Sequence, residues 1–333
     1  MLRSLFVRVG CVVAASAVVL MTGCSSDQPV SPASVTTATL AAGGAANIFS
    51  INYTSSTANT VMVTSLTNGT TTSLAVPAGF EATSVAFDST NAVMYLGGVT
   101  TASAYEVLAY PAASSSLLTP TRTIVSSGVF SEPDSMAVDA TGQLYVMSSL
   151  GVSVFPLTAN GTPTPTQSLT TTGTALVSPV MLAVDSAKNI YVVDATTQTS
   201  TVIEVFAAGS TGAVAPTRTI TYAAGYIYGI AVDSSLNLYA AEETQTSAQI
   251  VEFAAGANGA ATPTKTISGY ATGLYYLGGL ALDKVNNVYA INQNSSGTFS
   301  LLGYGPTATG NMAPGFTTTP SSIVSPQAAI AVY

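Results

Sequence analysis

The amino-acid sequence predicts an all-β protein, a six-bladed β-propeller whose blades each contain four antiparallel strands. The first observation behind this prediction is a recurring motif, in which an apolar run ending in Asp is followed by a polar turn and an aromatic residue. The second observation is the regular recurrence of that aromatic residue, with spacings of 46, 50, 46, 48 and 50 residues. It falls at Phe49, Tyr95, Tyr145, Tyr191, Tyr239 and Tyr289. Periods of this length are typical of propellers and other repeat architectures.

Each period predicts four strands in a fixed order. The first strand is short and apolar, as at 230–232 (IAV), which suits a position with neighbours on both faces. Turn-forming residues at 233–237 separate it from a second strand that begins at 238–240. A third strand ends in an aromatic residue, as at 203–206 (IEVF), and a fourth follows a proline, as at 215–220 (APTRTI). Because proline lacks an N–H donor, this fourth strand suits the outer edge of the blade.

The two ends of the repeat region predict how the ring closes. The chain ends in 328–333 (AAIAVY), which matches the first strand of a repeat with nothing after it. The first copy, 46–52 (ANIFSIN), lacks that strand. We therefore expect the C-terminal strand to complete the first blade, so that residues 46–333 form six blades of about 48 residues.

The N-terminal segment 1–23 is predicted to be a lipoprotein signal peptide. It has a positive start and an apolar stretch at 9–21 that is too short to span a bilayer. The residues MTGC (21–24) resemble the lipobox of bacterial lipoproteins, although Met21 stands where that family usually has Leu. The resemblance implies that Cys24 becomes the acylated first residue of the mature chain. An ordinary secretory signal is the alternative interpretation.

Residues 24–45, which begin with Cys24, are mostly small, polar and aperiodic, and they predict a flexible tether between the membrane and the propeller. Ser25 follows the cysteine, where lipoproteins retained on the inner membrane often carry Asp. We therefore expect a lipid-anchored protein of the cell envelope, held at the outer membrane and facing either the periplasm or the outside.

A known family shares the pattern of these repeats. The run of an apolar residue, Ala-Val-Asp, three variable residues and Asn-(Ile/Leu)-Tyr, followed by a strand such as 203–206, resembles the NHL repeat. The resemblance covers blades two to six well and blade one in part, and it implies a six-bladed propeller. It implies no single function, because propellers of this kind include enzymes, binding proteins and scaffolds.

Composition narrows the functions open to the propeller. The chain contains no histidine, and after loss of the signal peptide only Cys24 remains of its two cysteines. The usual general base, the usual zinc ligand and any disulfide are therefore missing. Five Lys and Arg residues remain against fifteen Asp and Glu, a net charge of −10. Nucleic acid is disfavoured as a partner, cationic or neutral partners are favoured, and we expect a monomer.

Five aspartates recur after the first strand of a repeat and could be mistaken for a catalytic or metal-binding ring. They are Asp88, Asp139, Asp185, Asp233 and Asp283. An Asp that opens a tight turn accepts hydrogen bonds from backbone N–H groups two residues further on. Since a feature shared by every repeat usually serves the fold, we interpret these residues as structural.

The position three residues after each repeat aromatic breaks the symmetry. Asp194, Glu242 and Asn292 occupy it on consecutive blades, in loops expected around the central channel. Oxygen ligands of this kind could hold Ca²⁺. The arrangement loosely resembles the metal site of gluconolactonase-type propellers, although their motifs cannot be matched residue by residue. A solvated acidic rim without metal is the alternative.

The loops before the first strands of blades five and six are rich in tyrosine. Tyr226, Tyr228, Tyr275 and Tyr276 are expected on one face of the ring, close to Glu243. Tyr222 and Tyr270 lie in the same two loops. Tyrosine combines rigid contact area with a polar tip, which suits sugar or peptide ligands. The alternative is that several of these rings fill gaps between blades.

These observations favour a lipid-anchored envelope propeller that binds a protein or carbohydrate ligand and performs no catalysis. A calcium-dependent hydrolase or lactonase that uses Asp194, Glu242 and Asn292 is a second interpretation. A structural envelope protein with no single partner is a third. Sequence alone leaves the identity of the ligand open.

Overall fold

The computed structural model describes residues 37, 40, 47–53, 59–171, 176–197, 200–222, 225–244, 247–319 and 326–332. The chain divides into two compact units, Met1–Ser34 and Val35–Tyr333, and the described residues all belong to the second. The predicted signal peptide, Cys24 and most of the predicted tether lie outside the described residues. In the described part of the chain, no helix is long and apolar enough to span a membrane.

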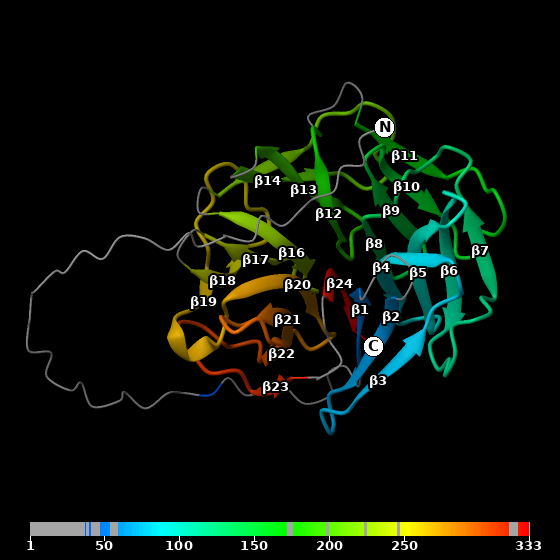
Figure 1. Cartoon of the computed structure of the whole chain (residues 1–333). Helices are drawn as coiled ribbons and strands as arrows, with labels where there is room; N and C mark the ends of the chain where they lie inside the picture. The colour runs from blue at the N-terminus through cyan, green and yellow to red at the C-terminus, as the bar shows by residue number, and fades with distance from the viewer. Residues whose placement is uncertain are drawn as a thin grey trace, which may run out of the picture. The chain divides into compact units, whose positions relative to one another are not determined.

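The second unit consists of six four-stranded antiparallel sheets, each of which is one blade, as the sequence predicts (Figure 1). Blade 1 contains β24 (Pro326–Val332), β1 (Asn47–Tyr53), β2 (Asn59–Ser65) and β3 (Thr71–Ala75). Blade 2 contains β4 (Phe80–Asp88), β5 (Val93–Thr100), β6 (Tyr105–Pro111) and β7 (Arg122–Val125). Blade 3 contains β8 (Ser135–Val138), β9 (Leu144–Ser148), β10 (Gly151–Phe155) and β11 (Gln167–Thr170).

The other three blades have the same strand order. Blade 4 contains β12 (Pro179–Val184), β13 (Ile190–Thr197), β14 (Ser200–Phe206) and β15 (Arg218–Thr221). Blade 5 contains β16 (Tyr226–Val232), β17 (Leu238–Glu243), β18 (Ala248–Phe253) and β19 (Lys265–Ser268). Blade 6 contains β20 (Tyr276–Leu282), β21 (Val288–Gln293), β22 (Phe299–Tyr304) and β23 (Phe316–Thr318), and a short 3₁₀ turn, η1 (Tyr270–Thr272), precedes it.

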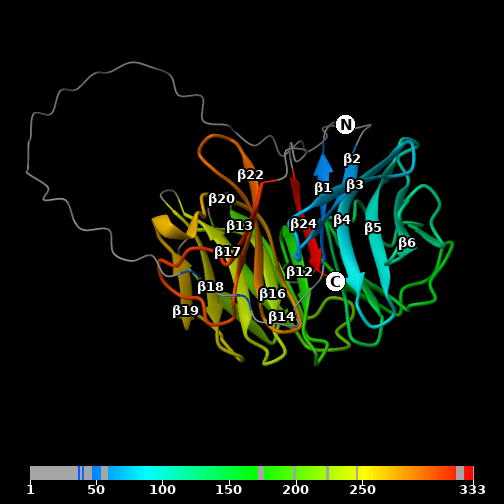
Figure 2. The same ribbon diagram turned by 90° about the horizontal axis from the view of Figure 1, so that it is seen from below.

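The innermost strands of the blades form a closed circle. Each contacts the next in the order β24, β4, β8, β12, β16 and β20, and β20 contacts β24 again (Figures 1 and 2). The C-terminal strand β24 pairs antiparallel with β1, with Phe49 opposite Ala331 and Ile48 opposite Val332. The first blade is thus assembled from both ends of the repeat region, the arrangement that the sequence predicts.

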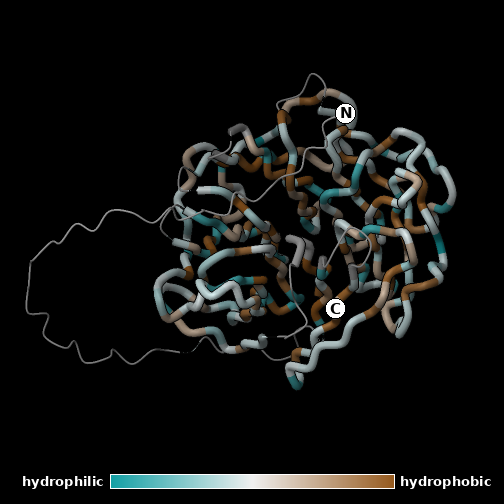
Figure 3. The backbone as a smooth tube through the Cα atoms, in the orientation of Figure 1, coloured by the Kyte–Doolittle hydropathy of each residue, from teal (hydrophilic) through white to brown (hydrophobic). Residues whose placement is uncertain are grey.

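The hydrophobic core lies between neighbouring blades. In each strand the side chains alternate between the two faces of the sheet, so one face packs against the preceding blade and the other against the following blade. On β13, for example, Val192 packs with residues of blade 3, whereas Tyr191 and Val193 pack with residues of blade 5. Hydrophobic segments accordingly follow the strands around the ring (Figure 3).

The recurring aspartates close the hairpin between the first two strands of their blades. The Oδ1 atom of Asp185 accepts hydrogen bonds from the N–H groups of Ala187 at 2.9 Å and Asn189 at 2.8 Å. Its Oδ2 atom accepts from the Asn189 side chain at 2.8 Å and from the Tyr191 hydroxyl at 3.1 Å. The other four carboxylates likewise accept the N–H two residues ahead. The structural interpretation of this motif is confirmed.

Two backbone hydrogen bonds join each of four outer strands to a glycine turn of the next blade. The Gly259 N–H donates to Thr219 at 2.7 Å, and the Thr221 N–H donates to Gly259 at 2.8 Å. Gly259 has a φ of +62°, a left-handed conformation that favours glycine. Equivalent bridges pair Ile124 with Gly161, Leu169 with Gly212 and Ile267 with Gly310. These contacts cover part of the outer edges that would otherwise be open to pairing with other chains.

Two residues of the predicted tether belong to the propeller. Thr37 forms a β-bridge with Ala313, in the loop between β22 and β23. Leu40 packs against the apolar cluster between blades 6 and 1, which includes Ile48 and Tyr289. The chain therefore meets blade 6 before the first strand begins, earlier than the predicted boundary at residue 46.

Candidate binding face

Two faces of the ring are defined by the direction of the inner strands. We call the face where the six inner strands begin the upper face, and the face where they end, at the aspartate hairpins, the lower face. Neighbouring blades contact each other on both faces, which supports the parallel alignment of their inner strands. On the upper side the Ser84 hydroxyl donates to the Pro133 carbonyl at 2.6 Å, and on the lower side Lys188 pairs with Asp139 at 3.2 Å.

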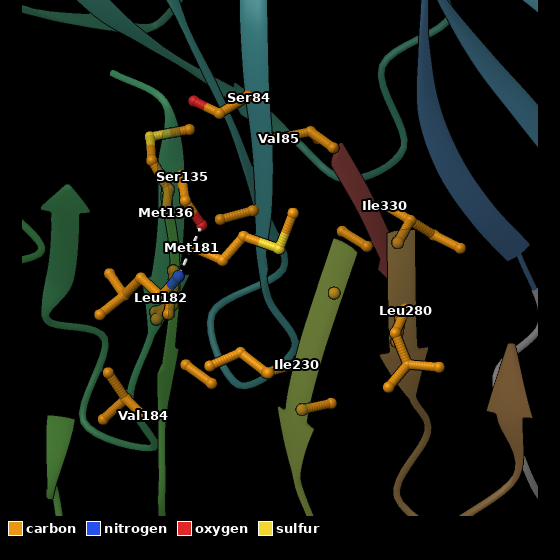
Figure 4. Close-up of a pocket in the computed structure, with 18 of the residues that line it drawn as sticks. Ser84, Val85, Ser135, Met136, Met181, Leu182, Val184, Ile230, Leu280 and Ile330 are labelled. Carbon is orange, nitrogen blue, oxygen red and sulfur yellow. Dashed lines mark hydrogen bonds between the residues drawn. The ribbon is translucent and has the colours of Figure 1, made fainter. Parts of the chain in front are cut away.

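A central channel of about 270 Å³ runs between the inner strands of all six blades. The apolar side chains that line it include Met136, Met181, Ile230 and Leu280 (Figure 4). The Ser135 hydroxyl, which also lines the channel, accepts a hydrogen bond from the Leu182 N–H at 3.1 Å. The channel wall therefore combines apolar side chains with polar groups.

Three carboxylates lie on the upper side of blades 2 and 3, close to the channel. Asp134 lines the channel directly, Glu132 precedes it in the same loop, and Glu81 lies near the start of β4. Asp134 is exposed to water at the mouth, and neighbouring protein atoms desolvate part of its carboxyl group. This desolvation, with a smaller contribution from the charge of Glu132, raises the pKa of Asp134 to about 7. Sequence reasoning missed this group, because its members occupy no repeated position.

In blades 4 and 6, the side chain three residues after the repeat aromatic accepts hydrogen bonds from the loop that precedes the inner strand of the same blade. The carboxylate of Asp194 accepts hydrogen bonds from the N–H groups of Val177 at 2.9 Å and Ser178 at 2.5 Å, just before β12. Asn292 does the same in blade 6, where its Oδ1 accepts from the Tyr275 N–H at 2.7 Å. Both side chains are buried. Their acceptor oxygens thus bond to the backbone of the loops that precede the inner strands.

Glu242, the residue at this position in blade 5, is arranged differently. Its side chain is fully buried, and its Oε2 atom accepts a hydrogen bond from Gln249 at 2.7 Å. Its Oε1 atom has no hydrogen-bond partner. Burial raises the pKa of this carboxyl, and the bond from Gln249 only partly offsets that effect.

The proposed calcium ligands thus differ in what their oxygens contact. The described part of the chain contains no group of three or more Asp, Glu, His or Cys side chains placed to hold a metal. The predicted set of Asp194, Glu242 and Asn292 contains only two carboxylates and one amide, so it is not a group of that kind. A calcium site there stays a prediction.

Tyrosines form two ring pairs on the upper side of blades 5 and 6. The rings of Tyr226 and Tyr228 lie 5.0 Å apart between centroids, and those of Tyr275 and Tyr276 lie 4.6 Å apart in an edge-to-face arrangement. Tyr275 is 46% exposed and Tyr276 is 52% exposed, whereas Tyr226 and Tyr228 are half-buried. The first pair rests on the interface between the blades, and the second pair is open to solvent.

Glu243 connects the two pairs. It is the cross-strand neighbour of Tyr226, and its carboxylate accepts a hydrogen bond from the N–H of Leu277, which follows Tyr276 in β20. Gly229 also brings the strands together, because a Cβ atom there would lie only 2.5 Å from the backbone nitrogen of Leu280. We call Tyr226, Tyr228, Glu243, Tyr275 and Tyr276 the tyrosine surface.

The remaining two tyrosines of these loops do not join it. The Tyr222 ring packs edge-to-face on Phe253 at 5.3 Å, and its hydroxyl accepts a hydrogen bond from Gln249 at 3.4 Å. It fills space between blades 4 and 5, the alternative that the sequence left open. Tyr270 is fully exposed in η1, beside the outer strand β19.

Comparisons with solved structures establish the fold. A chain of the nidogen/laminin complex matches with a TM-score of 0.56 and 16% identity, covering 86% of this chain and 97% of that chain. A putative 6-phosphogluconolactonase from Bacteroides uniformis matches with a TM-score of 0.51 and 15% identity, covering 84% of each chain. At these identities the likeness extends to the propeller fold alone. Neither a protein-family model nor a curated protein matches the sequence, so membership of the NHL family stays a prediction.

Proposed function

We propose that this chain is a lipid-anchored propeller of the cell envelope that binds a protein or carbohydrate ligand through the tyrosine surface. The observation that carries the proposal is the exposed pair Tyr275 and Tyr276, set beside Tyr226 and Tyr228 on one face of a rigid ring. Paired aromatic rings on a rigid scaffold provide contact area at low entropic cost, and they are enriched in binding hot spots.

Features of the rest of the molecule support binding in preference to catalysis. The sequence contains no histidine. The carboxylates that recur in the repeats accept hydrogen bonds from the backbone of the hairpins on the lower face. One matched structure is a complex of nidogen with laminin, so a chain with this fold occurs in a protein–protein complex.

Lipid anchoring is the second part of the proposal, and it rests on the lipobox-like residues that end at Cys24. Several acyl chains on one cysteine would hold the protein firmly, because each buried CH₂ group contributes about 0.8 kcal/mol. The Cys24→Ser variant should move from the outer-membrane fraction to the soluble envelope fraction. Retention of this variant in the membrane would contradict the anchor.

The ligand-binding part is tested by replacing Tyr275 and Tyr276 together with serine. Both side chains are exposed, so the fold should tolerate the change. The tagged double variant should lose the partners that the wild-type protein captures from an envelope extract, or lose its retention on envelope polysaccharide. Leu118→Ser is the matched control, because Leu118 is 60% exposed in the loop between β6 and β7 on the lower side. If the control loses the same partners, or the double variant loses none, the tyrosine surface is not the binding site.

A further inference from the structure

We propose that the upper face binds a cationic protein segment, an extended stretch that carries Lys or Arg side chains. This inference rests on the proposed function, because it assigns a chemical class to the ligand of the tyrosine surface. The observation behind it is the unequal division of charge between the two faces of the ring.

All of the basic side chains in the propeller are on the lower side. The guanidinium groups of Arg122 and Arg218 lie over the rings of Tyr95 and Tyr191, each at 5.8 Å from the ring centroid. These two tyrosines are cross-strand neighbours of Ala86 and Ala183, near the lower ends of the inner strands. The other three basic residues are Lys188, Lys265 and Lys284.

Those three lysines are likewise on the lower side. Lys188 pairs with Asp139 at 3.2 Å, and Lys265 pairs with Glu252 at 2.6 Å. Lys284 lies in the hairpin between β20 and β21, directly after Asp283. The upper face therefore has no positive side chain of its own among the described residues.

Negative charge on the upper face, in contrast, has no basic side chain beside it among the described residues. Within the described part of the chain, no ion pair involves Glu81, Glu132 or Asp134. Glu243 adds a further carboxylate, and it lies between the two tyrosine pairs. A surface of one sign attracts oppositely charged partners and repels those of like charge. This argues for a basic partner and against anionic polysaccharide or anionic lipid on the upper face.

The tyrosine surface suits such a partner in a second way. A Lys or Arg cation placed within about 6 Å of an aromatic ring is attracted by the negative face of the ring. Tyr275 and Tyr276 are exposed, and Glu243 is the cross-strand neighbour of Tyr226. A basic side chain docked there would meet aromatic rings and a carboxylate together, while neighbouring basic residues reach the carboxylates at the channel mouth.

The test uses short fluorescent peptides of alternating glycine and one other residue, which is lysine, serine or glutamate. Anisotropy is measured with the wild-type propeller while salt is raised from roughly 50 to 500 mM. The lysine peptide should bind at least about tenfold more tightly than the glutamate peptide, and its affinity should fall steeply with salt. Equal binding of the lysine and serine peptides, or binding that salt does not change, would overturn the inference.

Variants then locate the interaction. At pH 8, where most Asp134 carboxyl groups are ionised, Glu132→Gln combined with Asp134→Asn removes about two negative charges with little change of shape, and it should weaken the lysine peptide about threefold to tenfold. Tyr275→Ser combined with Tyr276→Ser should weaken it by a similar factor through loss of cation–π contacts. The control Lys284→Glu changes the net charge on the lower side, and it should alter affinity less than about twofold. If Lys284→Glu tightened binding as much as the acidic double variant weakened it, net charge alone would attract the peptide, which would overturn the assignment to this face.

Failure of this inference is distinguishable from failure of the proposed function. If the serine peptide or an envelope polysaccharide binds and the tyrosine double variant loses it, the tyrosine surface is a binding site for a neutral ligand. In that case the cationic assignment is wrong and the proposed function stands. If the tyrosine double variant changes neither peptide binding nor capture from the extract, both are wrong.

Discussion

Replacing Asp185 with alanine should destabilise the propeller without altering ligand binding on the upper face. The side chain is buried and accepts four hydrogen bonds, two from backbone N–H groups and two from the side chains of Asn189 and Tyr191. Water can reach Ala187 in the hairpin and can replace part of the lost bonding there. The Tyr191 hydroxyl is buried, and it loses a charged acceptor.

The magnitude follows from these contacts. Bonds to a charged group contribute about 1.5 to 3 kcal/mol each, and donors open to water recover much of that loss. The sum is a loss of about 2 to 5 kcal/mol in the free energy of unfolding, or roughly 4 to 10 °C in Tm for a domain of this size. Thermal unfolding followed by circular dichroism measures it, with Ser186→Ala in the same hairpin as a control expected within about 0.5 kcal/mol. An unchanged Tm for the Asp185 variant would refute the structural role of the recurring aspartates.

Three further predictions concern closure, pH and metal. Deleting residues 326–333 removes the inner strand of blade 1 and uncovers Phe49 and Ile48, so we expect a loss of at least about 4 kcal/mol in urea unfolding; an unchanged midpoint would contradict ring closure. The pKa of Asp134 is raised to about 7, above that of an aspartate in an unfolded chain, so its ionisation costs the folded state stability as the pH rises from about 4 to 7. Asp134→Asn should therefore raise Tm at pH 8 and not near pH 4, and an equal gain at both would exclude this linkage. Because the Asp194 carboxylate is bonded to its own loop, millimolar Ca²⁺, Mg²⁺ or Mn²⁺ should leave Tm unchanged; a rise that Asp194→Asn abolishes would establish a metal site.

The fold could be predicted from the sequence because its signals are local and repeated. An aspartate such as Asp233 bonds within its own hairpin, and an aromatic such as Tyr239 packs against the adjacent blade, so each copy of the motif reports the same geometry. The number of blades followed from the spacing and from the unpaired strands at the two ends. Only the contact of Thr37 and Leu40 with blade 6 lay beyond this reasoning, because it involves no repeated residue.

The candidate site could be predicted only in part. The tyrosine pairs on blades 5 and 6 and the neighbouring Glu243 lie together as the sequence suggests. The repeat spacing does not specify the orientation of a side chain in a loop. Tyr222, for example, fills space between blades and does not join the tyrosine surface. For the same reason, the bonding of Asp194 to its own loop was not foreseen.

The acidic group at the channel mouth was missed for a different reason. Glu132 and Asp134 stand in an irregular loop, where charged residues are usually just solvated. Their significance depends on the other blades, because Asp134 lines a channel built by the inner strands of all six blades and the basic residues lie on the opposite face. Such information is contained in the assembled ring and not in any one repeat.

The central claim, that ligands bind at the tyrosine surface on the upper face, is tested most directly by site-specific photo-crosslinking in intact cells. A benzoyl-phenylalanine residue is placed at Tyr276, where it keeps the aromatic ring, and in a parallel strain at Leu118 on the lower side. The account predicts a discrete light-dependent adduct from position 276 that disappears when Tyr275 is also changed to serine. Adducts from position 118 with none from position 276 would contradict it.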